Sequence, residues 1–122
     1  MDQQNRFQKL VAEAKQRITE ISATDAQREV ANGNARLVDV REESEWNQGH
    51  AQGAHHLSRG VIEVEIEDEV PDANQPIICY CGGGGRSALV ADNLQKMGYT
   101  NVRSLSGGMR AWKEAGLPIT RG

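Results

Sequence analysis

The sequence predicts a domain of the α/β class with a mostly parallel sheet, because strand patterns and helix patterns alternate along the chain. Short apolar runs typical of buried strands occur at 36–40, 76–81 and 101–105. Helical patterns follow the last two runs, over a segment that stops at Gly98 and over 109–116. A chain of 122 residues is long enough for one hydrophobic core, so we expect a single domain.

The first third of the chain carries the patterns of a helix, a short strand and a second helix. Apolar residues recur at helical spacing near the start: Phe7, Leu10, Val11, Ala14 and Ile18. We interpret this first helix as one that packs against the body of the domain, and we expect a short strand at 18–22. Thr24 and Gln27 have the spacing of a capping box, which predicts a helix with Thr24 as its N-cap. Gly33 predicts where that helix ends.

The middle of the chain is more acidic. A short acidic turn or helix is expected at 41–49 and a strand at 54–58. Apolar and acidic residues alternate over 61–69, which predicts a strand, although a short helix would suit the topology better. The acidic side chains between 63 and 72 are interpreted as a solvated face, and a docking surface for a basic partner stays open.

Composition and charge exclude several classes of protein. Hydrophobic residues make up 38% of the chain and charged residues 25%, as in soluble globular proteins. The net charge of -3 does not favour non-specific binding to nucleic acid. No apolar run approaches the length of about 18 residues that a membrane helix needs. The N-terminus has no signal-peptide pattern, so we expect a cytoplasmic protein.

The cysteines and histidines do not form a metal-binding pattern. Cys79 and Cys81 are too close on one strand to pair without distortion, so free thiols in a reducing compartment are the simpler interpretation. No second cysteine pair completes a zinc site. His50, His55 and His56 are interpreted as residues of the surface or the edge of the core. Cys79 is expected in the core, with a redox partnership to Cys81 as the alternative.

The most informative stretch joins the strand at 76–81 to the next helix. Four glycines lie between Cys81 and Arg86: Gly82, Gly83, Gly84 and Gly85. Glycines let successive backbone N–H groups turn inward around an anion, and a helix start adds partial positive charge. Arg86 offers a planar guanidinium and Ser87 a hydroxyl. These features favour a thiolate and predict a nucleophilic Cys81, with a pKa below the ordinary value of about 8.5.

The alternative for this loop is an inert cysteine before a phosphate-binding glycine loop. That alternative is disfavoured because a Walker-type loop needs a lysine, which this stretch lacks.

The segment CGGGGRS, at 81–87, resembles the active-site loop of rhodanese-like domains, the family of thiosulfate and related sulfurtransferases. Residues 37–60 resemble the family's aspartate-x-arginine strand end and its glycine-histidine-x-x-glycine-alanine segment. Residues 98–120 resemble its C-terminal strand, glycine pair and tryptophan helix. The resemblance implies a rhodanese-like fold, with a mostly parallel five-stranded sheet flanked by helices. It also implies an N-terminal helical extension at 1–17 before a domain at 18–122.

The resemblance implies a sulfurtransferase that works through a Cys81 persulfide. The thiolate attacks the outer sulfur of a small anionic donor such as thiosulfate, and a thiol or cyanide then accepts that sulfur. The loop amides are expected to stabilise the persulfide, and Arg86 to hold the anionic end of the donor. This chemistry needs no cofactor and no metal. A protein donor or acceptor of sulfur stays open.

Three further residues are supporting candidates by the same resemblance. Asp39 and Arg41 resemble an ion pair behind the loop, with an indirect role. Arg59 resembles a basic residue near the mouth of the pocket, and a solvated surface arginine is an equal alternative. The histidine of the glycine-histidine motif is expected to be a hydrogen-bonded structural residue, and Trp46 and Trp112 to be core residues.

Two other functions remain as alternatives. The first is a persulfide carrier that relays sulfur to a protein partner and turns over small donors poorly. The second is a small phosphatase of the related cysteine-x5-arginine type. The phosphatase is disfavoured because four residues, not five, separate Cys81 from Arg86.

Overall fold

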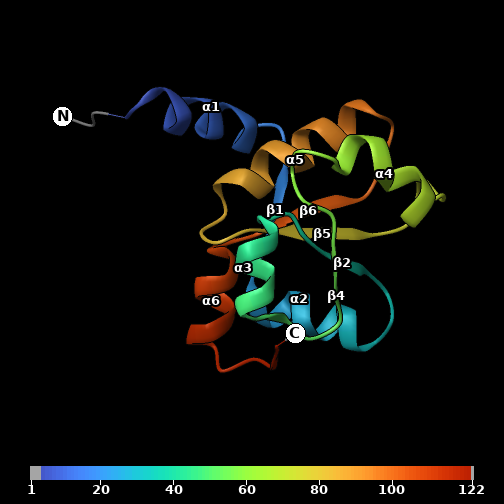
Figure 1. The fold of residues 1–122 in the computed structure, drawn as a ribbon. Helices are drawn as coiled ribbons and strands as arrows, with labels where there is room; N and C mark the ends of the chain where they lie inside the picture. The colour runs from blue at the N-terminus through green and yellow to red at the C-terminus, as the bar shows by residue number, and fades with distance from the viewer. Residues whose placement is uncertain (1–3, 122) are drawn as a thin grey trace.

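The computed structural model describes residues 4–121 and confirms the α/β class. A five-stranded sheet has the order β1-β6-β5-β2-β4, and each of its four pairings is parallel (Figure 1). The strands are β1 (Thr19–Ile21), β2 (Arg36–Asp39), β4 (Ala54–His56), β5 (Ile77–Tyr80) and β6 (Val102–Leu105). β5 occupies the centre of the sheet, as its apolar run predicts.

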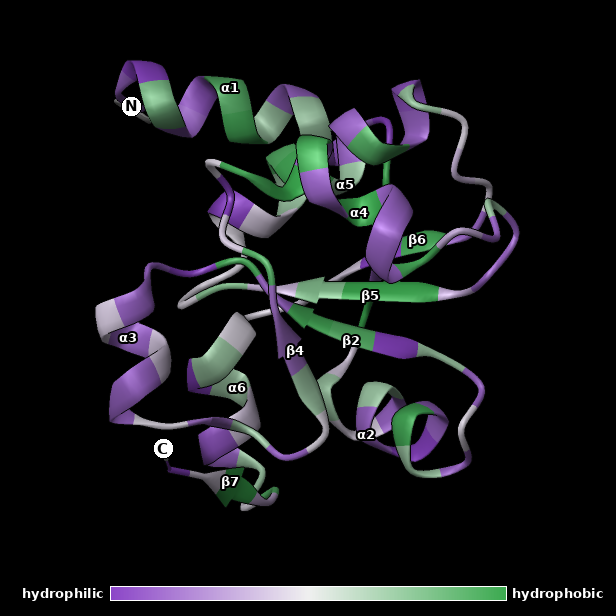
Figure 2. Ribbon diagram, turned by 45° about the vertical axis from the view of Figure 1, so that its right-hand side comes forward, coloured by the Kyte–Doolittle hydropathy of each residue, from purple (hydrophilic) through white to green (hydrophobic). Residues whose placement is uncertain are grey.

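Helices cover both faces of the sheet (Figures 1 and 2). One face carries α1 (Arg6–Lys15), α4 (Ile62–Glu69) and α5 (Gly85–Lys96); the other carries α2 (Ala23–Ala31), α3 (Glu43–Gln48) and α6 (Gly108–Glu114). A small antiparallel pair, β3 (His50–Ala51) with β7 (Ile119–Thr120), was not anticipated from the sequence. Within residues 4–121, no helix combines the length and the apolar character that crossing a membrane requires.

The central strand separates two hydrophobic cores. Ile77 and Cys79 pack with α4 and α5 on one face, whereas Ile78 and Tyr80 pack with α2 and α6 on the other. Figure 2 shows hydrophobic colouring along most of β5, as expected for a strand that is buried on both faces. Cys81 continues the alternation and therefore lies in the core on the α5 side.

The prediction of a strand at 61–69 is wrong, because this segment forms the helix α4, the alternative that suited the topology better. Ile62 and Ile66, four residues apart, are both fully buried on one side of the helix. Val64 lies between them in the alternating pattern but is 83% exposed. Burial therefore follows the helical period, and Val64 faces solvent.

The start of α2 also differs from the prediction. Its N-cap is Ser22, whose hydroxyl accepts a hydrogen bond from the Asp25 amide at 3.2 Å, and Thr24 lies inside the helix. The end of the helix agrees with the prediction, because Gly33 adopts the left-handed conformation (φ 75°) directly after the cap.

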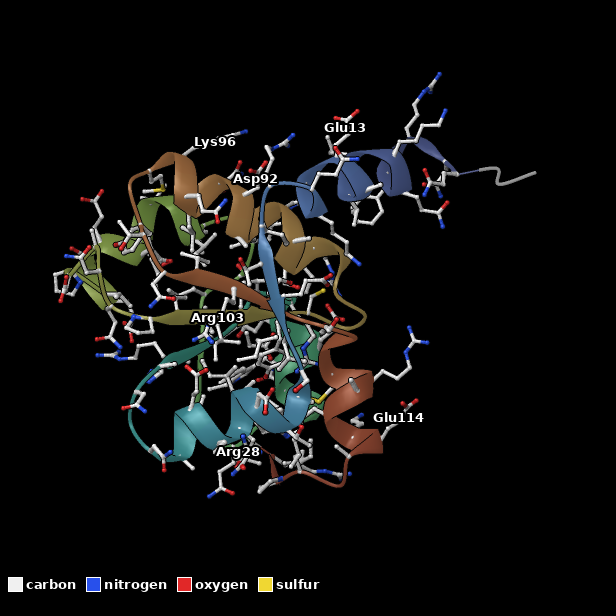
Figure 3. The ribbon with its side chains drawn as sticks, turned by 180° about the vertical axis from the view of Figure 1, so that it is seen from behind. Glu13, Arg28, Asp92, Lys96, Arg103 and Glu114 are labelled. Carbon is white, nitrogen blue, oxygen red and sulfur yellow. The ribbon has the colours of Figure 1, made fainter. Side chains whose placement is uncertain are left out.

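The N-terminal helix packs along α5, but less deeply than its apolar stripe predicts. Ala14 is buried, whereas Phe7 and Leu10 are 45% and 49% exposed. The guanidinium of Arg17 forms a bidentate ion pair with Asp92 of α5, at 2.8 Å for the shortest contact. Figure 3 labels Asp92 on α5, beside the end of α1. The boundary between an extension at 1–17 and the domain that follows stays a prediction.

Candidate active site

The glycine run forms the connection between β5 and α5, at the carboxyl end of the central strand. Helix α6 holds this connection from the other side of the sheet. The Met109 amide donates to the Cys81 carbonyl at 2.8 Å, and the Arg110 amide donates to the Gly82 carbonyl at 3.2 Å. Such close approach requires glycine at 108, because a Cβ there would lie 2.3 Å from the Cys81 carbonyl oxygen. Glycine at 108 therefore allows α6 to pack directly against the loop.

The Cys81 side chain is almost fully buried, and donors surround its sulfur. The Gly84 amide lies 3.1 Å from Sγ, and the Ser87 amide and hydroxyl both lie at 3.5 Å. Ser87 Oγ is in turn 2.8 Å from Ser104 Oγ on β6. Burial alone would raise the pKa of Cys81, but these hydrogen bonds together outweigh it and hold the pKa below its ordinary value. The geometry thus favours a nucleophilic thiolate.

The other cysteine has the opposite environment. Cys79 is fully buried in the α4/α5 core, and burial, with a smaller contribution from Cys81, raises its pKa to about 12. A protonated thiol in an apolar core is unreactive. This agrees with the interpretation of Cys79 as a core residue.

Arg86 has a partner that the sequence did not reveal. Its two terminal nitrogens bind both carboxylate oxygens of Glu45 on α3, at 2.8 Å and 3.0 Å. These hydrogen bonds outweigh the effect of burial and lower the pKa of Glu45 to about 2. Glu45 also accepts a hydrogen bond from the Glu42 amide, which fixes its position. The ion pair links α3 to the start of α5, directly after the loop. The Glu45 carboxylate also offsets the positive charge of the Arg86 guanidinium.

The predicted Asp39–Arg41 pair is a buried, bidentate ion pair with a shortest contact of 2.8 Å. Arg41 also donates to the Gly49 carbonyl at 2.8 Å, and the Tyr80 hydroxyl donates to Asp39 at 2.8 Å. The network joins β2, β5 and the end of α3 beside the α2/α6 core. None of these hydrogen bonds reaches Cys81, so the indirect role of the pair stays a prediction.

Trp46 stacks between two histidines. Its ring lies 3.4 Å from the His50 ring and 5.0 Å from the His56 ring, in near-parallel planes. Nδ1 of His50 is 3.1 Å from the Trp46 carbonyl, so His50 is hydrogen-bonded as predicted. Trp112 is a core residue, but Trp46 is only half-buried, so its assignment to the core is wrong.

Two further arginines, Arg59 and Arg110, differ in how near they lie to the loop. Arg59 is half-buried, and its amide donates to the Val40 carbonyl at 3.0 Å. Within residues 4–121 no hydrogen bond or ion pair joins its side chain to the loop, so its role stays a prediction. Arg110, which the sequence analysis did not single out, has its Nη2 only 3.3 Å from the position of a Cβ on Gly83. No sequence signal distinguishes it from the other exposed basic residues.

Comparison with known proteins identifies this arrangement. The sequence profile of the rhodanese-like domain matches residues 22–115. The chain belongs to the rhodanese-like family. The match includes the strand, loop and helix that surround Cys81, as the resemblance implied.

Three of the similar proteins illustrate the range of the matches. Thiosulfate sulfurtransferase GlpE of Actinobacillus succinogenes is 38% identical over 101 residues, which cover 83% of this chain and 89% of that relative. The polysulfide-sulfur transferase homodimer of Wolinella succinogenes has a TM-score of 0.82 and 29% identity, and the alignment covers 95% of this chain and 88% of that one. A Rhodopseudomonas palustris structure, described as a protein of unknown function and possible tyrosine phosphatase, has a TM-score of 0.82 and 31% identity, with 98% and 99% coverage.

The N-terminal helix of this rhodanese-like chain lies before the matched residues, yet it borders the active-site loop. A cavity of about 460 Å³ lies between them, and Phe7, Val11 and Lys15 of α1 line it together with Gly83 and Gly85. A Cβ on Gly85 would lie 3.3 Å from the Phe7 ring. Helix α1 therefore forms one wall beside the site, in addition to packing on α5.

Proposed function

We propose that this rhodanese-like protein is a thiosulfate sulfurtransferase that carries sulfur as a persulfide on Cys81. The observation that carries the proposal is the set of amide and hydroxyl donors around a buried Sγ. The relative named thiosulfate sulfurtransferase, which aligns over most of the chain, supports thiosulfate as the donor.

In the first half-reaction the Cys81 thiolate attacks the terminal sulfur of thiosulfate. A new sulfur–sulfur bond forms, the original sulfur–sulfur bond of the donor breaks, and sulfite leaves with the bonding electron pair. The product is a Cys81 persulfide. The Gly84 and Ser87 amides, which already point at Sγ, favour negative charge on the sulfur throughout this step.

In the second half-reaction a cyanide ion or a thiolate attacks the outer sulfur of the persulfide. The bond between the two sulfurs breaks, and its electron pair returns to Sγ, so the Cys81 thiolate is restored. The acceptor leaves as thiocyanate or as a persulfide. Two half-reactions through one covalent intermediate predict ping-pong kinetics. The free thiols of Cys79 and Cys81 are consistent with the reducing, cytoplasmic location predicted from the sequence.

The test is the intact mass of the protein after incubation with thiosulfate. We expect the wild type and a Cys79→Ala control to gain about 32 Da and to lose it again on addition of cyanide, as a persulfide intermediate requires. The Cys81→Ser variant should gain nothing. A wild type that gains no mass from thiosulfate would contradict the proposal.

The same measurement separates the alternatives. A gain from a persulfide donor or a cysteine desulfurase, but not from thiosulfate, would indicate the sulfur relay module. Hydrolysis of an aryl phosphate by the wild type, abolished in Cys81→Ser, would indicate the phosphatase that one structural relative is suspected to be. The proposed function predicts neither result.

A further inference from the structure

We propose that Arg110 is the donor-binding residue of this site: its guanidinium receives the anionic end of the sulfur donor at the exposed part of the loop. The inference deepens the proposed function and rests on it for the identity of the donor. It assigns this role to a helix residue outside the cysteine–arginine loop.

The position of Arg110 coincides with the place where the loop meets solvent. Of the four loop glycines, Gly83 is exposed, Gly84 is buried and the other two are half-buried. The Arg110 Nη2 atom is 3.3 Å from where a Cβ of Gly83 would be. The exposed guanidinium therefore lies over the loop residue that an incoming ligand reaches first. Gly83 directly precedes Gly84, whose amide donates to Cys81 Sγ.

The backbone of Arg110 is anchored to the loop itself. Its amide donates to the Gly82 carbonyl at 3.2 Å, and the preceding Met109 amide donates to the Cys81 carbonyl at 2.8 Å. The Cα position is thus set relative to the nucleophile, and only the side-chain torsions remain free. The anchored backbone keeps the guanidinium within reach of the loop.

The charge balance at the site selects Arg110 over Arg86. Glu45 binds both terminal nitrogens of Arg86 and offsets its charge. Among residues 4–121, no carboxylate lies within salt-bridge distance of Arg110. The reaction brings an anionic donor to an anionic thiolate, so an uncompensated positive charge at the entrance lowers the repulsion between them. Arg110 carries such a charge.

The chemistry of a guanidinium suits this ligand. A planar fork of N–H donors can bind two oxygens of a sulfonate-like group at once. The same contact stabilises the negative charge that builds up on sulfite as it leaves. Glycine at 83 leaves the space next to the guanidinium free of a side chain.

The first experiment measures steady-state kinetics of the full chain with thiosulfate and cyanide. We expect Arg110→Ala to lower kcat/KM for thiosulfate by about tenfold, the effect of losing about 1.4 kcal/mol of charge-assisted binding. The kcat/KM for cyanide, which reports the second half-reaction, should fall several-fold less, because cyanide meets the same field but has no pair of oxygens for the guanidinium to bind. Arg110→Lys should retain part of the activity with thiosulfate. The matched control is Lys113→Ala, which removes the same charge from the same helix and should change neither value.

The second experiment does not depend on sulfur transfer. Cys81 is alkylated with anionic iodoacetate and with neutral iodoacetamide, and the ratio of the two rates is taken. The fraction of thiolate cancels in this ratio, so the ratio reports the field that the reagent meets. We expect the ratio to fall several-fold in Arg110→Ala, to fall less in Arg110→Lys and to stay constant in Lys113→Ala. Added salt should lower the ratio in the wild type more than in Arg110→Ala.

The outcomes separate the two proposals. If the wild type takes no sulfur from thiosulfate, the proposed function fails, whereas the alkylation ratio still tests Arg110. An alkylation ratio for Arg110→Ala that equals the ratio for Lys113→Ala would overturn the inference. Equal losses of kcat/KM for thiosulfate and for cyanide would also overturn it, because they would indicate a structural role for Arg110.

Discussion

Ser87→Ala gives the most direct test of how the loop activates Cys81. The Ser87 hydroxyl lies between two groups, 3.5 Å from Cys81 Sγ and 2.8 Å from Ser104 Oγ. Since it helps to lower the pKa of Cys81, its removal should raise that pKa. The thiolate then forms at higher pH, and less of it is present at neutral pH.

The size of the effect follows from the geometry. A hydrogen bond to a charged group contributes about 1.5–3 kcal/mol, and a shared hydroxyl at 3.5 Å belongs near the lower limit. A loss of about 1.4 kcal/mol lowers the thiolate population about tenfold at any pH well below the pKa. The variant also leaves the buried Ser104 hydroxyl without its partner, at a cost in folding stability of about 1–3 kcal/mol.

The assay is the rate of iodoacetamide alkylation of Cys81 from about pH 5 to about pH 9, where a thiolate with a lowered pKa forms. The wild type, Ser87→Ala, Ser104→Ala and the double variant are compared, together with their free energies of unfolding. Peptide mapping assigns the label to Cys81. The buried thiol of Cys79, whose pKa is about 12, should contribute no signal.

The double variant separates reactivity from stability. Removing both hydroxyls leaves no unpaired donor, so the double variant should recover part of the stability that Ser87→Ala loses, but none of the thiolate reactivity. Ser104→Ala alone should lose stability and keep the reactivity of the wild type. A pH profile of Ser87→Ala that coincides with that of the wild type would refute hydroxyl activation of Cys81.

Two further predictions concern the elements that hold the loop. Gly108→Ala should destabilise the protein by about 3 kcal/mol or more, because a clash with the Cys81 carbonyl adds to the strain of a positive φ. Gly98→Ala, which also has a positive φ but open space around its Cβ, should cost only about 1–2 kcal/mol; equal losses in urea unfolding would contradict the clash. Glu45→Gln should lower the free energy of unfolding by less than about 1 kcal/mol above pH 4.5, since the ion pair with Arg86 is partly exposed. Because the folded pKa of Glu45 is about 2, this difference should shrink as the pH falls from about 4.5 and be lost as the pH passes through about 2; a difference that keeps its full size at about pH 2 would argue against the ion pair.

The fold and the family could be predicted because their signals are local in sequence. The apolar run of β5, the glycines after Cys81 and the helix stop at Gly98 each occupy a few consecutive residues. The order of three family motifs then indicated the family and its enzyme class, both of which the comparisons support.

Contacts between distant segments could not be predicted in this way. Arg86 and Glu45 are 41 positions apart, and nothing in the acidic segment marks Glu45 rather than its neighbours as the partner. Arg110 reaches Gly83 only because α6 docks against the loop. The alternating pattern at 61–69 was compatible with both a strand and a helix. Packing of α4 against α5, which the sequence does not show, selects the helix.

The hydrogen bonds between α6 and the loop also affect when the active site forms during synthesis. The amides that satisfy the Cys81 and Gly82 carbonyls belong to Met109 and Arg110, which leave the ribosome well after the loop. Until they arrive, the loop lacks the bonds that set its shape, although all of its own residues are present. We therefore expect the thiolate to be favoured only late in folding, and a nascent chain to expose an ordinary cysteine until then.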